Sequence, residues 1–464
     1  MYTIKTAGVE IDSNFTLIPQ LTFQYDTQKQ ALEHNIGVDL MYRPSADKLL
    51  SATVAPDFGT ADADELVANF SPIEVFFPEN RTFFTEYHSI FDVKDDSNQF
   101  VLVNTRRIGA VTDGNVRAPA ELEYAGKFVS VGNSLDTGLL YASEKDLGIA
   151  NGKSFLVARG KAHLEKGYVG TLLTLTDRPE IARKAYTAVV DINLWSEDWL
   201  LDGVLIGSRL DEQRRTDGLG FYVDGEYAIN RNTNFSAQLM WFDDKLEIDD
   251  VGFLERNNIK KLDLSADTTL YEAYDFAPEL YLGASTTLRR NFEGEQLASN
   301  LNLIGVLTDN DAWEFLAEFN YRFSGIDDLI SFGNGSVDLP SQKDIYFEVA
   351  TPSGNNTQFI FAWNYFQEGL NGWAHAIDPT IRYAFTDSVN IELSAYFQES
   401  DDWLIGNGLG QLERFKHSFR EFDLKLLWLI SQNQEINARF QWNGYSATAL
   451  DLFDISGREL VAQG

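Results

Sequence analysis

The stretch WEFLAEFNYRF, residues 313–323, alternates apolar and polar side chains along its length. Because successive side chains of a β-strand point to opposite faces, this period of two predicts a strand with one apolar and one polar face. The apolar positions are Trp313, Phe315, Ala317, Phe319, Tyr321 and Phe323. The polar positions are Glu314, Glu318, Asn320 and Arg322.

The same period recurs along most of the chain, in roughly twenty segments. Short turns at residues 230–233, 386–388 and 431–434 alternate with longer acidic loops at 243–258, 324–344 and 399–418. This order predicts antiparallel strands joined as successive hairpins. Further examples of the pattern are 188–194, 221–230, 235–241, 262–270, 280–288, 359–365, 389–397, 422–430 and 436–442.

The length of the segments decides the class of all-β protein. Strands of about ten residues match a tilted crossing of a bilayer, whereas sandwich strands usually have about five or six. Aromatic side chains also gather near predicted strand ends, as at Trp195, Trp199 and Trp442. We therefore predict a transmembrane antiparallel up-and-down β-barrel of about 18–22 strands over residues 1–464. A large soluble β-protein is the alternative.

This class predicts the outer membrane of a Gram-negative bacterium, with membrane lipid and lipopolysaccharide as neighbours. The apolar faces would then look toward lipid and the charged faces would enclose water. The predicted lumen-facing charges are Asp224, Glu226, Glu314, Glu318, Arg322, Glu392 and Arg439.

The charge and the cysteine count exclude other classes. The 37 Lys and Arg against 70 Asp and Glu give a net charge of −33, which argues against a nucleic-acid partner. The chain has no Cys, so it has neither disulfides nor thiolate metal sites.

The alternation fails between Asp57 and about Asp92, and we expect it to resume near QFVLVNTRRIG, residues 99–109. A segment without strand pairing cannot lie against lipid, because its backbone groups would be unsatisfied there. We therefore predict that residues 57–93 fold inward as an inserted plug or constriction. The residues assigned to it are Asp57, Phe58, Phe76, Phe77, Pro78, Glu79, Arg81, Phe83, Phe84 and Glu86, together with Arg106 and Arg107.

Within this segment the four phenylalanines of FFPENRTFF, residues 76–84, are expected to form a local core with Pro78 fixing the turn. Glu79 and Arg81 would pair with inward charges, for which Arg106, Arg107, Glu226 and Glu318 are candidates. The alternative is that the motif only braces the wall and gates nothing.

The order of these residues resembles a family of bacterial outer-membrane barrel proteins of unknown function. That family carries a Phe-Phe-Pro-Glu-Lys-Arg-x-Phe-Phe-x-Glu signature between an Asn-Pro-Asp-Phe segment and an Arg-Arg-Ile-Gly element. Ala55 and Asn80 depart from the pattern, in place of Asn and Lys. The resemblance implies the barrel fold. A carbohydrate-binding-like (family 9-like) domain commonly precedes it in the family and is not found in this sequence. The matching positions are Pro56, Asp57, Phe58, Asp64, Phe76, Phe77, Pro78, Glu79, Arg81, Phe83, Phe84, Glu86, Arg106, Arg107, Ile108 and Gly109.

No pattern predicts catalysis, a metal or a cofactor. The five His, at positions 34, 88, 163, 375 and 417, lack a zinc-like spacing. His88 beside Ser89 is too little to indicate a hydrolase. The segment DVKDDSNQ, residues 92–99, offers oxygen ligands for calcium, but without the spacing of an EF-hand loop. We expect a solvated loop there and no enzyme activity.

The sequence thus predicts an outer-membrane channel or transporter for a polar solute, with a lumen narrowed by residues 57–93. The alternative function is a non-conducting barrel that anchors or sheathes a partner protein of a surface or periplasmic complex.

Overall fold

The computed structural model describes residues 14–26, 31–56, 66–114, 118–148, 150–354, 356–386, 388–432 and 434–463. Asp57 and Phe58 therefore lie outside the described residues. The elements are β1 (Asn14–Asp26), β2 (Ala31–Ser45), β3 (Lys48–Val54), α1 (Thr82–Thr85), η1 (His88–Ile90), β4 (Phe100–Val101), η2 (Thr105–Arg107), β5 (Leu122–Ser130), β6 (Leu135–Glu144), β7 (Ser154–Leu164), β8 (Gly167–Arg178), η3 (Pro179–Ile181), β9 (Arg183–Trp195), β10 (Trp199–Asp211), β11 (Arg215–Asn230), β12 (Thr233–Phe242), β13 (Phe253–Leu254), β14 (Ile259–Tyr274), β15 (Ala277–Arg290), β16 (Asn300–Thr308), β17 (Glu314–Arg322), β18 (Gly325–Asp327), β19 (Val337–Leu339), β20 (Gln342–Ala350), β21 (Thr357–Glu368), β22 (Gly372–Thr386), β23 (Val389–Gly406), β24 (Gln411–Ser431), β25 (Gln434–Ser456) and β26 (Glu459–Ala462).

The predicted all-β class and its antiparallel hairpin order are confirmed. Strands β1–β10, with β4 outside the series, pair antiparallel in chain order. Strands β14–β17 and β20–β26 do the same. In the described part of the chain 22 strands belong to the main sheet, at the upper end of the predicted range. The helices described there are all too short to cross a membrane.

Two compact units make up the chain. The first unit contains Met1–Asp64, Val75–Val223 and Met240–Ile259, and the second contains Glu65–Glu74, Asp224–Leu239 and Lys260–Gly464. The two units differ in what covers one face of their strands, so each is described by itself.

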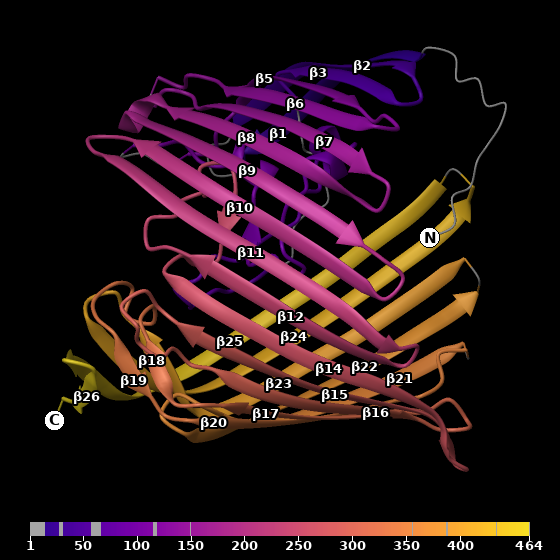
Figure 1. Cartoon of the computed structure of the whole chain (residues 1–464), viewed down its shortest axis with the longest axis vertical. Coiled ribbons are helices and arrows are strands. Elements are labelled where there is room, and N and C mark those ends of the chain that lie inside the picture. The colour runs from indigo at the N-terminus through magenta and orange to yellow at the C-terminus, as the bar shows by residue number, and fades with distance from the viewer. Residues whose placement is uncertain are drawn as a thin grey trace. The chain divides into compact units, whose positions relative to one another are not determined.

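In the first unit, both faces of the strands carry apolar side chains, and the buried face also holds charged groups such as Lys127, Arg159 and Asp191. Figure 1 shows β5–β10 as neighbouring antiparallel strands, and one of their faces is buried. We call it the packed face. It includes Leu49, Val129, Leu140, Val157, Leu172, Val189 and Ile206. The opposite face exposes Leu139, Leu173, Val190 and Leu205. The expectation that the inward faces of the strands enclose water is therefore wrong for this unit, where the charged side chains of that face are buried in a packed core.

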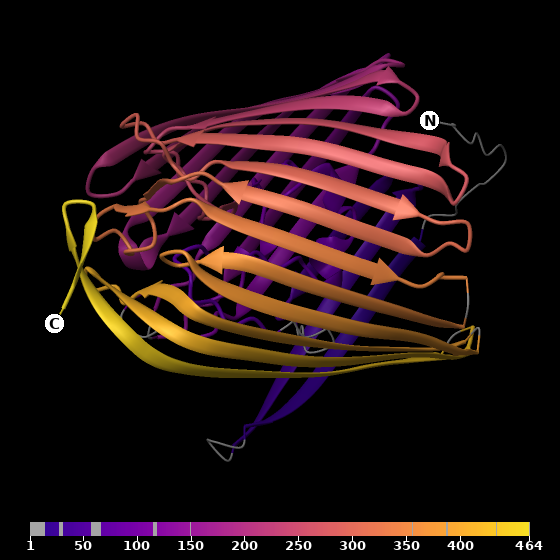
Figure 2. The same ribbon diagram turned by 90° about the horizontal axis from the view of Figure 1, so that it is seen from below.

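In the second unit, the strands keep the predicted alternation. Figure 2 shows its long strands in orange to yellow, running side by side. One face, which we call the polar face, carries Asn302, Glu318, Tyr346, Asn364, Asp378, Tyr396 and Glu421. The other, the apolar face, exposes Leu303, Ile345, Phe347, Phe361, Trp363, Leu393 and Leu424.

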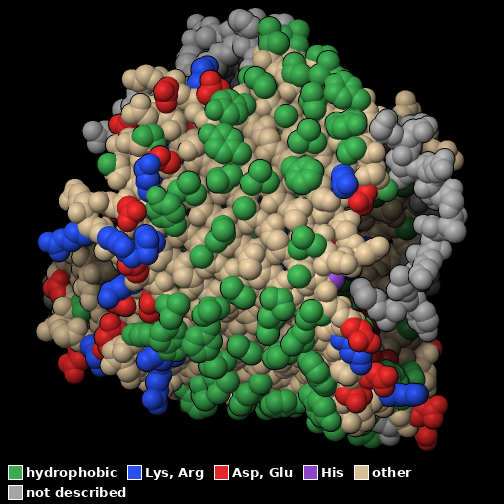
Figure 3. Space-filling model, turned by 45° about the horizontal axis from the view of Figure 1, so that its top comes forward, with side chains coloured by type: hydrophobic (Ala, Val, Ile, Leu, Met, Phe, Trp, Pro, Cys, Tyr) green, Lys and Arg blue, Asp and Glu red, His purple; other side chains and the backbone are tan. Residues whose placement is uncertain are grey.

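Exposed apolar side chains are thus common to both units. Figure 3 shows one surface of the molecule on which hydrophobic side chains spread over the middle, while Lys, Arg, Asp and Glu side chains gather toward its margins. A soluble monomer rarely exposes so many large apolar side chains, so the exposed apolar face of each unit is suited to a hydrocarbon environment.

Two boundaries differ from the sequence-based expectation. Residues 399–418 are not a long loop, because β23 and β24 continue through them to a short turn at residues 407–410. The main-sheet pattern also resumes only at Leu122, and not near Gln99. Residues Phe100–Val103 are all buried, so this apolar run belongs to a core and has no wet face.

Candidate functional site

The predicted inserted segment divides into two parts with different environments. Residues 66–74 belong to the second unit, and residues 75–93 belong to the first together with residues 94–109 that follow the predicted segment. We call residues 66–74 the lining segment and residues 75–109 the anchored segment. The rest of the predicted insert, residues 57–65, lies outside the described residues.

The anchored segment completes the hydrophobic core of the first unit. Phe84 and Phe91 are buried in the same cluster as Val157 and Leu172 of the packed face. Phe83 packs edge-on against Phe84, with 5.1 Å between ring centroids. Each buried aromatic or aliphatic side chain contributes about 1.5–3 kcal/mol by leaving water. The segment is therefore an integral part of this core.

The motif phenylalanines do not all enter that core. Phe76 contacts Phe253 of the 243–258 loop at 5.3 Å between ring centroids, and Phe77 is half-buried. The four phenylalanines therefore do not form a separate local core. Phe83 and Phe84 instead join a larger core, which the anchored segment forms together with the strands and the 243–258 loop.

Charged side chains of the strands hold the backbone of the anchored segment. Lys127 of β5 donates to the carbonyl of Phe83 at 2.5 Å and also to that of Glu86. Arg159 of β7 donates to the carbonyl of Ile90 at 3.1 Å. Such charge-assisted hydrogen bonds satisfy carbonyls that have no strand partner.

Arg159 is itself held by a buried carboxylate. Its guanidinium makes two hydrogen bonds to Asp191 of β9, at 2.5 and 2.7 Å, and both side chains are almost fully buried. The pair occupies the space beside Gly170 of β8, where a Cβ atom would lie 2.5 Å from each partner. A larger residue at position 170 would therefore have to displace the Arg159–Asp191 pair.

Glu79 and Arg81 of the motif pair with each other. Arg81 donates to Glu79 through Nε at 2.8 Å and through Nη2 at 2.6 Å, and Thr105 donates to the same carboxylate at 2.6 Å. Arg81 also donates to the carbonyls of Ile108 and Thr105. This pair joins the start of the anchored segment to η2.

The electrostatics of Glu79 follow from these contacts. Burial alone would raise the pKa of Glu79, but the hydrogen bonds and charge of Arg81 and the hydrogen bond from Thr105 outweigh it and lower the pKa below its usual value. The carboxylate is thus ionised at neutral pH.

The remaining predicted residues of the anchored segment also make defined contacts. Arg106 donates to the carbonyl of Pro78 at 2.9 Å and lies 4.0 Å from Glu79. Arg107 donates to the carbonyl of Gly252 at 3.0 Å. Glu86 forms an ion pair with Arg43 of β2. Arg106 thus lies near Glu79, as predicted, although Arg81 is the main hydrogen-bond partner of Glu79.

The lining segment lies on the polar face of the second unit. The Leu66 N–H donates to the side chain of Gln441, and Asn443 donates to the Leu66 carbonyl, both at 3.0 Å. The Phe70 ring contacts Trp403 at 5.0 Å and Tyr445 at 5.4 Å. Leu66 and Phe70 are nevertheless exposed.

The predicted lumen-facing charges are distributed along the second unit. Glu318 accepts from Asn302, and Arg322 donates to Gln342 at 3.5 Å. Arg439 donates to Asp423 at 2.9 Å. Asp224 is half-buried, whereas Glu226 and Glu314 are exposed. Glu392 belongs to the polar pocket described next.

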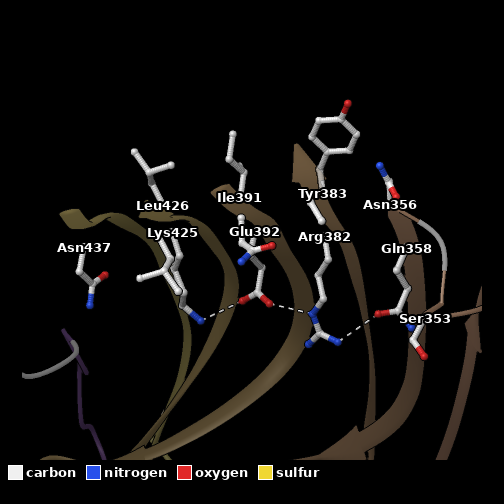
Figure 4. Close-up of a pocket in the computed structure, with 13 residues that line it drawn as sticks. Ser353, Asn356, Gln358, Arg382, Tyr383, Ile391, Glu392, Lys425, Leu426 and Asn437 are labelled. Atoms are coloured by element: carbon white, nitrogen blue, oxygen red, sulfur yellow. Dashed lines mark hydrogen bonds and ion pairs between the residues drawn. The ribbon is translucent and has the colours of Figure 1, made fainter. Parts of the chain in front are cut away.

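A cavity of about 550 Å³ lies at the short-turn end of β21–β25. Figure 4 shows Gln358, Arg382, Glu392 and Lys425 pointing to one side of these strands, linked by dashed contacts. Arg382 donates to Glu392 at 2.8 Å, and Lys425 donates to the other oxygen of Glu392 at 2.9 Å. Asn356, Asn390 and Asn437 add amide groups to the lining. Of these residues, only Glu392 was predicted.

No metal site emerges from the described residues, among which no group of three or more His, Asp or Glu is placed to hold an ion. In the segment considered for calcium, Asp95 instead accepts from the N–H of Phe100 at 3.0 Å and from that of Ser97 at 3.3 Å. These hydrogen bonds give Asp95 a structural role in the turn.

In the comparisons with known proteins, a protein-family model matches part of the chain. Residues 14–137 match a model described as a domain of unknown function (DUF5916), a span that includes the whole anchored segment. The match covers less than a third of the chain. The comparison with curated proteins gives no match.

Several solved structures resemble the chain at low identity. OccAB2 of Acinetobacter baumannii has 11% identity and a TM-score of 0.38, with 70% of this chain and 93% of that chain covered. A variant of the ferric enterobactin receptor PfeA of Pseudomonas aeruginosa has 9% identity and a TM-score of 0.45, with 94% and 75% covered. A bacterial polysaccharide outer membrane secretin has 11% identity and a TM-score of 0.32, with 68% and 100% covered. Likenesses of this size carry no argument about what the chain does.

Proposed function

We propose that the chain spans the outer membrane of a Gram-negative bacterium as a closed β-barrel and acts as a channel or transporter for a polar solute. The observation that carries the proposal is the two-faced second unit, whose strands expose apolar side chains on one face and polar ones on the other. Closure follows from the lipid environment, because an open sheet edge would leave backbone groups unsatisfied there.

Ion current through the purified protein tests this proposal. The detergent-extracted protein should change its gel mobility on boiling and should give discrete current steps in a planar bilayer. Freely soluble protein that needs no detergent would contradict the membrane assignment. A barrel that gives no current and co-purifies with a stoichiometric partner would instead support the alternative function, a barrel that anchors or sheathes that partner.

We further propose that the lining segment narrows the path for the solute. Its support is its location on the polar face, where two hydrogen bonds to Leu66 and the ring contacts of Phe70 attach it. The anchored segment is instead buried in a core and is unsuited to movement.

Two phenylalanine substitutions separate these parts. Phe70→Ala removes an exposed ring from the polar face and should increase single-channel conductance, whereas the matched control Phe76→Ala lies in the anchored segment and should leave it unchanged. Equal conductance in wild type and Phe70→Ala would remove the lining segment from the proposed path. An increase in Phe76→Ala alone would assign the narrowing to the anchored segment.

A further inference from the structure

The polar pocket of the second unit contains a row of charged side chains at one level of the sheet. Strand register places Gln358 opposite Arg382, and Arg382 opposite Glu392. It also places Glu392 opposite Lys425, and Lys425 opposite Arg439. Four successive hairpin pairings therefore hold the row in position.

The row carries more positive than negative charge. The row contains three cations, Arg382, Lys425 and Arg439, and one carboxylate, Glu392, which pairs with Arg382 and Lys425. A second carboxylate, Asp423, lies one step along β24 and pairs with Arg439 at 2.9 Å. Counting both carboxylates, the cluster has a net charge of +1, from three positive and two negative groups. This excess contrasts with a chain whose net charge is −33.

Glu392 shows how an anion fits the pocket. Each of its two oxygens accepts from one cation, Arg382 at 2.8 Å and Lys425 at 2.9 Å. A carboxylate or phosphate of a ligand has oxygens of the same kind, and guanidinium groups suit both. The other polar groups of the pocket are amides and two hydroxyls, those of Ser353 and Tyr383, which do not repel an anion.

The contacts of Glu392 are also weak enough to be exchanged. The side chains of Arg382 and Lys425 remain 53% and 47% exposed. Ion pairs between such exposed groups are worth about 0–1 kcal/mol, so displacing Glu392 from its partners costs an incoming anion little. The cavity of about 550 Å³ leaves room for a small solute beside the row.

From these observations we propose that the pocket binds the carboxylate or phosphate group of an anionic solute through Arg382 and Lys425, with Glu392 as the internal competitor that the solute displaces. This inference rests on the proposed function and gives it a substrate class.

Binding to the purified protein in detergent tests the site without requiring transport. Inorganic phosphate and acetate are titrated by calorimetry at low salt, with glycerol as the neutral comparison. The wild type should bind one or both anions and not glycerol. Arg382→Gln and Lys425→Gln should each weaken binding by about tenfold, and Glu392→Gln should strengthen it by a similar factor. The anion that binds identifies which oxyanion the site prefers.

Lys416→Gln is the matched control, because Lys416 lies on the same strand and pairs with Asp401 at 2.8 Å. It should bind anions as the wild type does. Gel mobility before and after boiling verifies that each variant is folded. Equal affinities in wild type, Arg382→Gln and Lys425→Gln, or weaker binding in Glu392→Gln, would overturn the proposed site.

The current measurement separates this inference from the function on which it rests. Anion binding without any current would retain the site and remove the channel. Current that is the same for wild type and Arg382→Gln, with no anion binding in detergent, would retain the channel and remove the site.

Discussion

Strands β7–β10 of the first unit and β20–β23 of the second have the same antiparallel pairing in chain order, yet opposite surroundings. At one level of the first unit, Leu172, Val189 and Ile206 lie side by side and buried. In the second unit the corresponding face carries Tyr346, Asn364 and Asp378. The anchored segment covers the first set, and only the lining segment is described on the polar face of the second unit. One fold therefore provides both a core and a wetted wall.

The same difference changes the meaning of an ion pair. Arg159–Asp191 is buried and holds the anchored segment, whereas Arg382–Glu392 is exposed. A charge in a core is costly when its partner is lost, but water replaces the partner at an exposed site. This contrast makes the two units distinguishable by substitution.

The largest expected effect comes from breaking the buried pair. Arg159→Met leaves the Asp191 carboxylate buried without its partner and should destabilise the protein by about 3–5 kcal/mol. The matched change in the second unit, Arg382→Met, should cost at most about 1 kcal/mol. Unfolding by denaturant in the presence of lipid measures both. Similar losses for the two variants would contradict the contrast between a dry and a wet face.

The next largest effect is expected from a comparison of two phenylalanines, Phe84 and Phe70, of the predicted insert at residues 57–93. Phe84 is 2% exposed in the core of the first unit, whereas Phe70 is 45% exposed. Phe84→Ala opens a cavity and should cost about 3 kcal/mol, while Phe70→Ala should cost less than about 1 kcal/mol. The same unfolding measurement applies. A large loss for Phe70→Ala would show that the lining segment is also part of a core.

The smallest expected effect is a pH dependence specific to the first unit. Because its contacts lower the pKa of Glu79, the ionised carboxylate stabilises the folded state above the unfolded pKa, which is about 4.3. This stabilisation is lost as pH falls through the lower folded pKa. Glu79→Gln should therefore lose about 1–3 kcal/mol at pH 7 and less in strong acid.

Melting temperatures of the wild type and Glu79→Gln at pH 7 and in strong acid measure this difference. The matched, more exposed carboxylate is Glu392, whose side chain is 27% exposed, and Glu392→Gln should show a smaller difference at pH 7. A gap between wild type and Glu79→Gln that does not change with pH would contradict the role assigned to the Glu79 charge.

The sequence also contains runs of consecutive apolar residues that indicate the packed face. The search for alternation alone does not detect them. The runs TLLTLT at 171–176 and GVLIG at 203–207 are nearly continuous in apolar and small residues. Such runs are typical of strands buried on both faces, whereas residues 313–323 alternate strictly. The run FVLV at 100–103 has the same character, and it is buried without joining the main sheet.

The candidate pocket was harder to predict from the sequence than the packed face. Glu392 was predicted to face the polar side, but its partners Arg382 and Lys425 are separated from it by 10 and 33 positions. Strand alternation gives the face of each residue, and only the register brings three strands to one level. The lining contacts of Gln441 and Asn443 with Leu66 span still longer separations.

By itself, the sequence determined the all-β class, the antiparallel order and most of the turns, because alternation and turn residues are local properties of the chain. It also marked residues 57–93 as an interruption. Only the tertiary structure decided that this interruption divides into a buried part and an exposed part, because burial depends on which strands face the segment. The row of charged side chains at Glu392 likewise depends on the register between neighbouring strands, which the sequence of a single strand does not determine.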